Sequence, residues 1–317
     1  MSIKITIGIT CYNAEATIVQ AIESACMQDY ADFEIVVVDD CSQDNSVSLV
    51  KEAIKDKTNI LLVCHKENKG YPSALNSIIE NAQGDYIAFF DDDDMSRSDR
   101  LSEQLVRIQA YGRLHRTDFI FCYTNRNILL VGETIPSGKA FAIGRTFPEP
   151  HGLDVADFLL WHSGASGFVW GMFGSCTLMA PRSAFLKVGP FDPDFRRCAE
   201  WDLAVRAAFM GAHFISVDQP LVCQRKTPTR DKAGKIPLKY AMMLRKKHKN
   251  YLDAKGVYAA SLMIARARYF GGKHRMVWSR FYHFLACCLA PRTIGYETAC
   301  RVLRRVTRLQ VLKKFYG

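Results

Sequence analysis

The sequence predicts an α/β fold with a doubly wound, mostly parallel sheet that carries helices on both faces, followed by a basic helical C-terminal extension. Short apolar runs of strand length alternate with segments of helical periodicity along the first half of the chain, as in consecutive βαβ units. Several of the runs are apolar without interruption, which is typical of strands buried on both faces. With 49% hydrophobic residues, the chain can form a packed core.

Each expected element follows from its own residues, beginning with the β-branched run KITIGIT at 4–10. Strands are predicted at 4–10, 33–40, 59–65, 85–91 and 118–124. Helices are predicted at 14–28, 46–56, 71–84 and 99–112, where apolar residues recur at helical spacing. The third helix has Pro72 in its first turn and Gly84 past its end, a common pair of helix boundaries.

The second half of the chain is less regular. No element is predicted from about residue 130 to 175. Apolar periodicity returns over 174–192, and a helix followed by a strand is expected over 199–217. Helices are then predicted at 238–252, 258–270 and 300–316. We expect one domain over residues 1–224 and a basic helical region over residues 225–317.

Acidic residues follow two of the predicted strands, as Asp39–Asp40 and as the run Asp91–Asp94. Because parallel strands end at the same edge of a sheet, we expect these carboxylates to meet where α/β folds bind ligands. Alternate residues of an extended chain face one way, so Asp91 and Asp93 can share a divalent cation. A solvated acidic loop that precedes a helix at Asp99 is the competing interpretation.

Three segments together resemble glycosyltransferase family 2. They are ITCYNAEATIVQAIESACMQDYADFEIVVVDDCSQDNS, ENKGYPSALNSIIENAQGDYIAFFDDDD and GPFDPDFRRCAEWDLAVRAAFMGAHF. Their order and spacing match the family's segments over about residues 3–224. The resemblance implies a GT-A fold, a divalent cation (Mn²⁺ or Mg²⁺), and transfer of a sugar from a nucleotide donor with inversion at the anomeric carbon.

The resemblance also implies which residues hold the donor. Thr10, where the family usually has proline, and Asp39 lie where the family holds the donor base, and Asp39 can accept a hydrogen bond from the imide N–H of uracil or thymine. A role as a turn acid fits Asp40 better. Lys69 lies near the expected pyrophosphate, with a solvated lysine as the alternative.

By the same resemblance, the acidic run holds the ribose and the metal. Asp91 and Asp92 lie where the family approaches the ribose and the metal. Asp93, the last acid of the D-x-D motif, is the expected metal ligand. Asp94 is expected to support the site or the fold. A cation at this place would stabilise the charge that develops on the leaving nucleoside diphosphate.

A general base must activate the acceptor hydroxyl on the opposite face of the sugar, much as in inverting glycosidases. Glu200, in AEWDL, is the expected base. Aligned on W-D-L, the family's E-D pair falls on Ala199 and Glu200, so one acid is missing and the other is longer by a methylene group. Asp202 is a rival base, although an acid in the first turn of a helix is also favoured by the helix dipole.

The chain carries a net charge of +10 that is divided unevenly. Residues 1–224 hold 19 Lys and Arg against 29 Asp and Glu, whereas residues 225–317 hold 23 against 3. We expect the basic region to contact an anionic membrane surface, with residues 276–292 as an interfacial element. Nucleic acid is possible by charge alone, but no recognised nucleic-acid-binding pattern is visible.

The sequence also predicts where in the cell the protein is located. None of the eleven cysteines forms a C-x-x-C pair, so we expect reduced thiols in a cytoplasmic protein. The first residues have the pattern of a strand rather than of a signal peptide, and no apolar stretch approaches the length of a membrane span. The expected location is therefore the inner face of the cytoplasmic membrane, bound peripherally.

These observations lead to a functional hypothesis and two alternatives. We expect a non-processive hexosyltransferase that moves a sugar, with a UDP-sugar as the expected donor, to a lipid-linked oligosaccharide or another glycan. The pathway would be the biosynthesis of bacterial lipopolysaccharide O-antigen, capsule or exopolysaccharide. No Q-x-x-R-W motif of processive synthases follows the expected domain. The alternatives are a catalytically silent nucleotide-sugar-binding or scaffold protein with the same fold, and a nucleic-acid binder.

Overall fold

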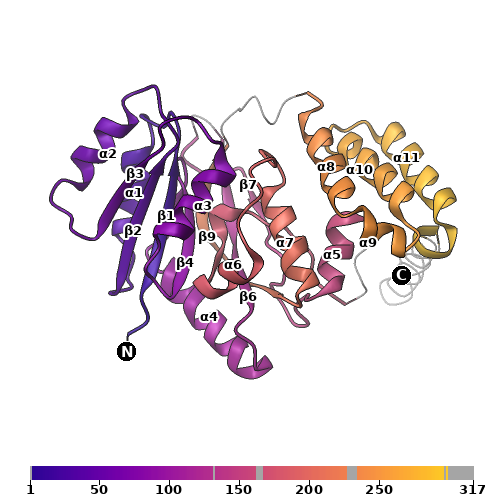
Figure 1. The fold of residues 1–317 in the computed structure, drawn as a ribbon, viewed down its shortest axis with the longest axis horizontal. Helices are drawn as coiled ribbons and strands as arrows, with labels where there is room; N and C mark the ends of the chain where they lie inside the picture. The colour runs from indigo at the N-terminus through magenta and orange to yellow at the C-terminus, as the bar shows by residue number, and fades with distance from the viewer. Residues whose placement is uncertain (1, 131–132, 162–166, 227–233, 296–297, 299–317) are drawn as a thin grey trace, which may run out of the picture. The chain divides into compact units, whose positions relative to one another are not determined.

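The computed structural model describes residues 2–130, 133–161, 167–226, 234–295 and 298 of the chain (Figure 1). By their internal contacts the residues form two compact units. The first unit comprises residues 1–155 and 166–229, and the second comprises residues 156–165 and 230–317. The predicted boundary after residue 224 lies close to this division, but the assignment of residues 156–165 to the second unit was not predicted.

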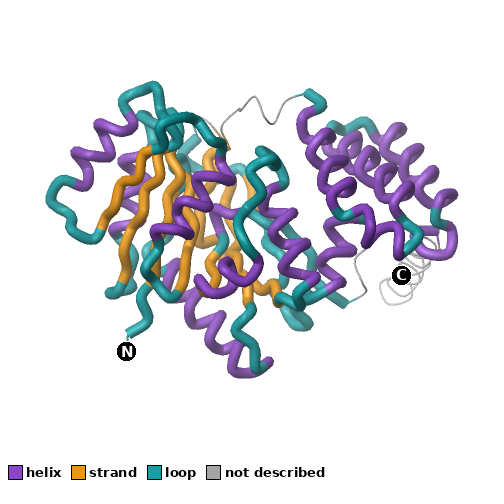
Figure 2. Tube along the Cα trace, in the orientation of Figure 1, coloured by secondary structure: helices purple, strands orange, loops and turns teal. Residues whose placement is uncertain are grey.

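A nine-stranded mixed sheet forms the centre of the first unit (Figures 1 and 2). The strands are β1 (Ile5–Cys11), β2 (Phe33–Asp39), β3 (Ile60–Cys64), β4 (Tyr86–Asp91), β5 (Met95–Ser96), β6 (Ile120–Leu130), β7 (Gly138–Ala140), β8 (Met179–Pro181) and β9 (His213–Lys226). Their order is β3-β2-β1-β4-β8-β6-β9-β5, with β7 paired to β6. The longest ladders, including β1–β2, β1–β4 and β6–β9, are parallel, which confirms the predicted fold class.

Helices cover both faces of the sheet. They are α1 (Ile18–Cys26), α2 (Ser46–Ile54), α3 (Tyr71–Asn81), α4 (Arg100–His115), α6 (Arg182–Val188) and α7 (Ala199–Phe209), with a 3₁₀ turn η1 at Ser175–Thr177. Residues Ile5, Ile7 and Ile9 of β1 belong to the buried cluster that includes α1 and α4. Because side chains alternate along a strand, Gly8 faces the other way, toward α3.

The contact between β1 and α3 depends on a glycine. A Cβ atom on Gly8 would lie 2.2 Å from Cγ2 of Ile78, which is far inside van der Waals contact. The absence of a side chain at Gly8 therefore lets α3 approach the sheet closely. This approach matters for the site, because α3 begins at Tyr71, directly beyond the carboxyl ends of β1 and β2.

The structure adds elements where the sequence predicted none. The stretch from about 130 to 175 contains β7 and α5 (Leu153–Leu160), and α5 is held by buried apolar residues such as Val155 and Leu159. These elements are too short to show a clear period in the sequence. The helix predicted at 238–252 is interrupted at His248. The helix predicted at 300–316 lies outside the described residues.

The second unit is helical. It contains α8 (Ile236–Lys247), α9 (Lys249–Ala254), α10 (Tyr258–Gly272), α11 (Met276–Leu289), a π-helical turn at Pro291–Gly295 and the end of α5. The buried guanidinium group of Arg245 donates to the carbonyl of Ser261, and Arg268 donates to those of Phe158 and Leu159. Within the described part of the chain, no helix is both long and apolar enough to cross a bilayer.

Candidate active site

The two groups of acidic residues meet at one edge of the sheet, as predicted. Strand β1 lies between β2 and β4, with Thr10 in register with Asp91 and Cys11 in register with Asp39. The carboxyl ends of all three strands therefore lie together. Thr10 itself is almost completely buried at this edge.

Asp39 and Asp40 have different surroundings. Asp39 is 2% exposed, and its carboxylate accepts hydrogen bonds from the amide and the hydroxyl of Ser42. Asp40 accepts from the amides of Lys69 and Gly70 at 2.9 and 2.8 Å. Asp40 therefore holds the turn before α3 in place, which is a structural task, whereas contact of Asp39 with a donor base stays a prediction.

Lys69 projects from the turn that Asp40 holds. Its side chain is exposed, while its amide is fixed on Asp40. The next residue, Gly70, has φ +88°, a conformation that glycine adopts without strain and other residues rarely adopt. The turn thus presents Lys69 from a defined position before the start of α3, and its contact with a pyrophosphate stays a prediction.

The carboxylates of the acidic run have separate partners. Asp91 ends β4, and Asp92 and Asp93 form the turn that follows it. Asp92 Oδ2 accepts a hydrogen bond from the amide of Tyr12 at 3.0 Å, which ties the turn to the end of β1. Asp94 Oδ1 accepts from the amide of Arg225 at 3.1 Å, and its Oδ2 is buried without a hydrogen-bond partner.

Burial and mutual repulsion make this run costly in its fully ionised form. Burial, assisted by the charge of Asp93, raises the pKa of Asp91 to about 6. Burial raises the pKa of Asp92 to about 8, and it raises the pKa of Asp94 well above its ordinary value. The buried guanidinium group of Arg100 offsets part of this negative charge and has its own pKa lowered by burial to about 10. Such a site favours protons or an added cation.

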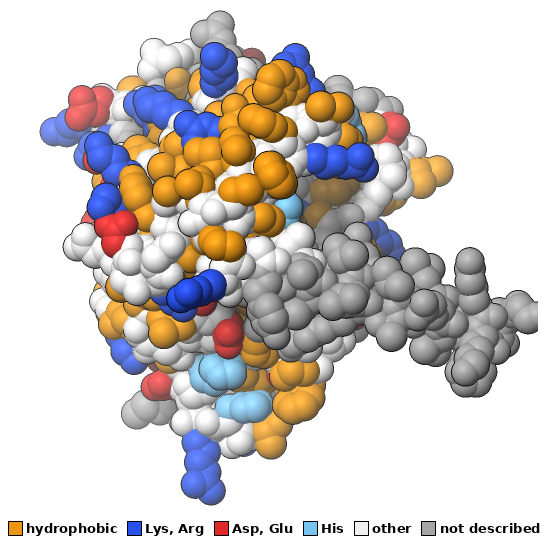
Figure 3. All heavy atoms as spheres, turned by 90° about the vertical axis from the view of Figure 1, so that its right-hand side faces the viewer, with side chains coloured by type: hydrophobic (Ala, Val, Ile, Leu, Met, Phe, Trp, Pro, Cys, Tyr) orange, Lys and Arg blue, Asp and Glu red, His pale blue; other side chains and the backbone are white. Residues whose placement is uncertain are grey.

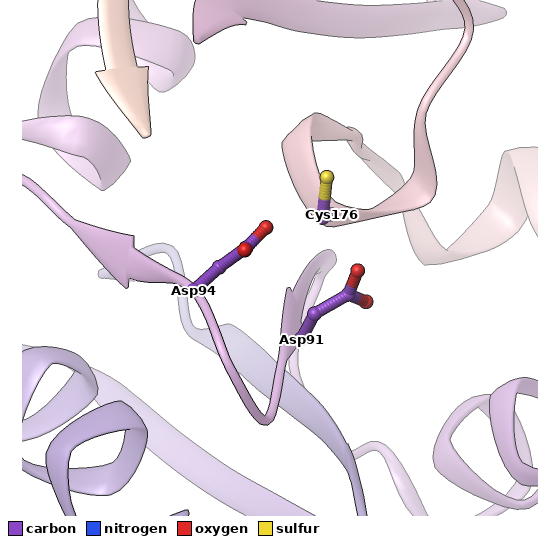
Figure 4. A group of neighbouring side chains, drawn as sticks. All are labelled: Asp91, Asp94 and Cys176. Atoms are coloured by element: carbon purple, nitrogen blue, oxygen red, sulfur yellow. The ribbon is translucent and has the colours of Figure 1, made fainter. Parts of the chain in front are cut away.

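The geometry of the run suits a divalent cation. One ligand atom each from Asp91, Asp94 and Cys176 lies within 4.8 Å of the others, and Figure 4 shows the three side chains converging from β4, the following turn and η1. Two carboxylates suit Mg²⁺ or Mn²⁺, and the unpartnered Oδ2 of Asp94 is a free acceptor. Asp93, the predicted ligand, lies in the same turn but outside this trio.

A chain of hydrogen bonds connects the acidic run to the expected base. Asp91 Oδ1 accepts from the hydroxyl of Tyr71 at 2.9 Å, and this hydroxyl lies 2.6 Å from Oγ of Ser175. Ser175 in turn donates to Oε1 of Glu200 at 3.0 Å. Sequence reasoning did not identify Tyr71 or Ser175, because they are about a hundred residues apart and only the fold brings them together.

The two hydroxyl groups of this chain connect the carboxylates. Tyr71 and Ser175 donate to Asp91 and Glu200, and either hydroxyl oxygen can be the donor in the 2.6 Å contact between them. Because a hydroxyl group both donates and accepts, the chain links the acidic run to Glu200 without a break.

Glu200 is half-buried in the first turn of α7. The helix is preceded by Cys198 at φ +66°, a conformation that costs energy outside glycine. Its neighbour Asp202 is completely buried and accepts from Nε of Arg206 at 2.9 Å. Arg206 also donates to the main-chain carbonyl of Val188, at the end of α6, and to that of Pro190 beyond it. The surroundings of Asp202 are therefore structural, and Glu200 is the acid of this pair that contacts the site.

Comparisons with known proteins relate the chain to glycosyltransferases. Residues 6–138 match the family described as "Glycosyl transferase family 2". The chain is 43% identical over 108 residues to the succinoglycan biosynthesis protein ExoO of Rhizobium meliloti, covering 34% of this chain and 30% of that one. It is 27% identical over 221 residues to the amylovoran biosynthesis glycosyltransferase AmsB of Erwinia amylovora, covering 69% of this chain and 68% of that one.

A solved structure shares the fold. The crystal structure of residues 1–349 of S. aureus TarS in complex with UDP-GlcNAc matches 84% of this chain and 73% of that chain, with a TM-score of 0.60 and 18% identity. Three of the sequence relatives are matched over only 23%, 48% and 30% of their own lengths. The fold and the matched segment together make this chain similar to glycosyltransferase family 2 over residues 6–138, on a GT-A-like fold.

Proposed function

We propose that the protein is an inverting, metal-dependent, non-processive glycosyltransferase that uses a nucleotide-sugar donor. The observation that carries the proposal is the hydrogen-bonded chain from Asp91 through Tyr71 and Ser175 to Glu200. It supports the proposal because it links a candidate base, through two hydroxyl groups, to a buried carboxylate cluster that favours protons or an added cation. A structural acidic loop would require neither the buried run nor its connection to a second carboxyl group.

In this proposal, each part of the site has a task. A divalent cation held by carboxylates of the run stabilises negative charge on the departing diphosphate. Asp39 accepts from the donor base, and Lys69 contacts the pyrophosphate. Glu200 takes the proton of the acceptor hydroxyl on the opposite face of the sugar, which gives inversion. Ser175 keeps the Glu200 carboxylate oriented toward that hydroxyl.

The nucleotide is inferred from Asp39 and the pathway from the named relatives. A UDP-sugar suits Asp39, because its carboxylate can accept from the imide of uracil, and the TarS complex named above contains UDP-GlcNAc. Relatives named for succinoglycan and amylovoran biosynthesis support a role in assembling a bacterial polysaccharide. We infer a glycan or lipid-linked oligosaccharide as acceptor, and an anionic membrane surface as the partner of the basic region of this cytoplasmic protein.

Calorimetric titration tests the donor site. The purified protein is titrated with UDP, dTDP and GDP, each with and without Mn²⁺. We expect one nucleotide to bind, to bind more tightly with metal, and to lose the metal effect in Asp93→Ala and Asp91→Asn. An exposed acid on α2, Glu52→Gln, is the matched control. If no nucleotide binds under any condition, the acidic run is structural and the proposed activity is wrong.

A catalytically silent nucleotide-sugar-binding protein is the second candidate, because Ala199 stands where the family usually has an acid. The variant Glu200→Gln distinguishes the two. An enzyme should lose transfer while its nucleotide affinity remains. A silent binding protein would release no nucleoside diphosphate from any nucleotide sugar that it binds, whichever residue is at position 200.

A further inference from the structure

Helix α11 has apolar residues on both sides, although only one side is buried. Its sequence is MVWSRFYHFLACCL, with Arg280 as its one charged residue. Side chains recur on the same face of a helix every three or four residues. Val277, Phe281, Phe284 and Cys288 have this spacing and form a single row, which we call the outer row. A row of large apolar side chains along a helix normally faces a core or another apolar partner.

The inner side of α11 accounts for its place in the helical unit. The ring of Tyr282 stacks on that of Phe270 in α10, with centroids 5.5 Å apart. Ser279 Oγ donates to the carbonyl of Ala267 at 2.8 Å, and Ala286 is completely buried. These contacts attach α11 to α10 without using any member of the outer row.

The outer row is open in the described part of the chain. Val277 is 80% exposed, Phe284 is 63% exposed and Phe281 is 47% exposed. Trp278 and Leu289 extend the apolar surface along one edge of the row. Figure 3 views the side on which α11 lies in Figure 1, and it shows hydrophobic side chains gathered there with Lys and Arg side chains among them.

The charge around this surface indicates what covers it. Residues 234–295 contain thirteen Lys and Arg but a single acid, Asp253. Lys273, Arg275 and Arg280 lie just before or within α11 and are exposed. A second copy of the same surface would bring these cations together and be repelled. An anionic partner with an apolar layer fits both features, and a bilayer with acidic headgroups has both.

The length of the helix decides how it would meet a bilayer. Fourteen residues extend about 21 Å, which is shorter than the hydrocarbon thickness of about 30 Å. The apolar row runs along one side, and cations lie at its edge and at its start. We propose that α11 lies in the plane of an anionic membrane surface, with the outer row inserted and Lys273, Arg275 and Arg280 at the headgroups.

This surface specifies the membrane partner named under the proposed function, and its test does not depend on catalysis. The full chain is mixed with vesicles of phosphatidylcholine alone or with one quarter phosphatidylglycerol, and bound protein is measured by sedimentation. We expect binding to the anionic vesicles only. The double variant Phe281→Ser/Phe284→Ser should weaken it by about tenfold or more, because two large apolar groups no longer leave water.

The matched control removes exposed apolar groups elsewhere. Val106 and Leu114 of α4 are 65% and 75% exposed, and Val106→Ser/Leu114→Ser should bind vesicles like the unaltered protein. Circular dichroism checks that both double variants fold, and the milder Phe284→Leu should retain most of the binding. Trp278 should also report insertion, through a blue shift of emission that Trp278→Phe loses.

Three results would overturn the proposal. They are no binding to anionic vesicles, equal binding by the outer-row variant and the unaltered protein, and an oligomer of the unaltered protein that the outer-row variant abolishes. The last result would assign the surface to a second copy of the chain. Nucleotide titration of the same preparations separates this proposal from the active site, because vesicle binding can fail while the donor still binds.

Discussion

Removing the hydroxyl group of Ser175 should slow catalysis without weakening donor binding. In the structure Ser175 donates one hydrogen bond of 3.0 Å to Oε1 of Glu200. Hydrogen bonds to charged groups contribute about 1.5–3 kcal/mol. Since Glu200 is only half-buried, we take the lower end. A loss of about 1.5 kcal/mol corresponds to about a tenfold decrease in kcat for Ser175→Ala.

The assay can use water as the acceptor, since the base would activate water as it activates a hydroxyl group. Release of nucleoside diphosphate from the donor identified by titration is followed at saturating and limiting donor. The expected pattern is a lower kcat with an unchanged KM, because the hydroxyl orients the base and is remote from the nucleotide. Ser175→Thr keeps the donor group and should recover most of the rate.

The Tyr71→Phe variant tests the next step of the same chain. Its hydroxyl contacts both Ser175 and Asp91, so its loss should affect the base and the cation site together. We expect a lower kcat combined with weaker Mn²⁺ binding. The reasoning is refuted if Ser175→Ala turns over as fast as the unaltered protein, or if it loses donor affinity while kcat is unchanged.

Four further predictions concern the fold and the charges. Gly8→Ala should lower the free energy of unfolding, measured in urea, by about 1–3 kcal/mol, because the new methyl group meets Ile78. The double variant Gly8→Ala/Ile78→Ala should lose less stability than the sum of the two single variants. Strictly additive losses would contradict the contact between the two positions. Arg100→Met should lower the free energy of unfolding by about 3 kcal/mol, because it leaves the carbonyl of Phe89 and other buried acceptors unpaired. Arg100→Lys should lower it by less. The affinity for Mn²⁺ should rise between about pH 6 and 8, because Asp91 and Asp92 lose their protons over this range. The number of protons released when Mn²⁺ binds should fall over the same range, which calorimetry in two buffers can measure. Because folding raises both pKa values, the metal-free protein should lose stability as the pH rises through that range, and an opposite slope would contradict the burial of these carboxyls.

The sequence was sufficient for the parallel half of the fold and for the position of its acids. Continuous apolar runs indicated strands buried on both faces, and the intervening helical periods required crossover connections. Once the strands are parallel, their carboxyl ends lie at one edge. Asp39 and Asp91 therefore lie at the same edge, and the strand order then puts them on either side of β1.

The sequence could not show which side chains connect these acids to the base. Tyr71 begins α3, Ser175 lies in a 3₁₀ turn, and Glu200 opens α7, so their contact depends on antiparallel β8 joining the parallel strands. Cys176 reaches Asp91 and Asp94 for the same reason. Ser175 and Cys176 carry no periodic signal, because a short irregular element is placed by long-range contacts. The periodicity at Tyr71 and Glu200 predicts helices, but it does not show which side chains meet.

The basic region shows the same division between sequence and structure. Its charge and its helical periods could be predicted from the sequence, because composition and spacing are local properties. The buried face of α11 could not be predicted, since both faces carry apolar residues and either could have packed on α10. Tertiary contacts of the inner side, such as that between Tyr282 and Phe270, turn the row of Val277, Phe281 and Phe284 outward. Local pattern determined the elements, and the competition of apolar faces for one core decided which surface was left open.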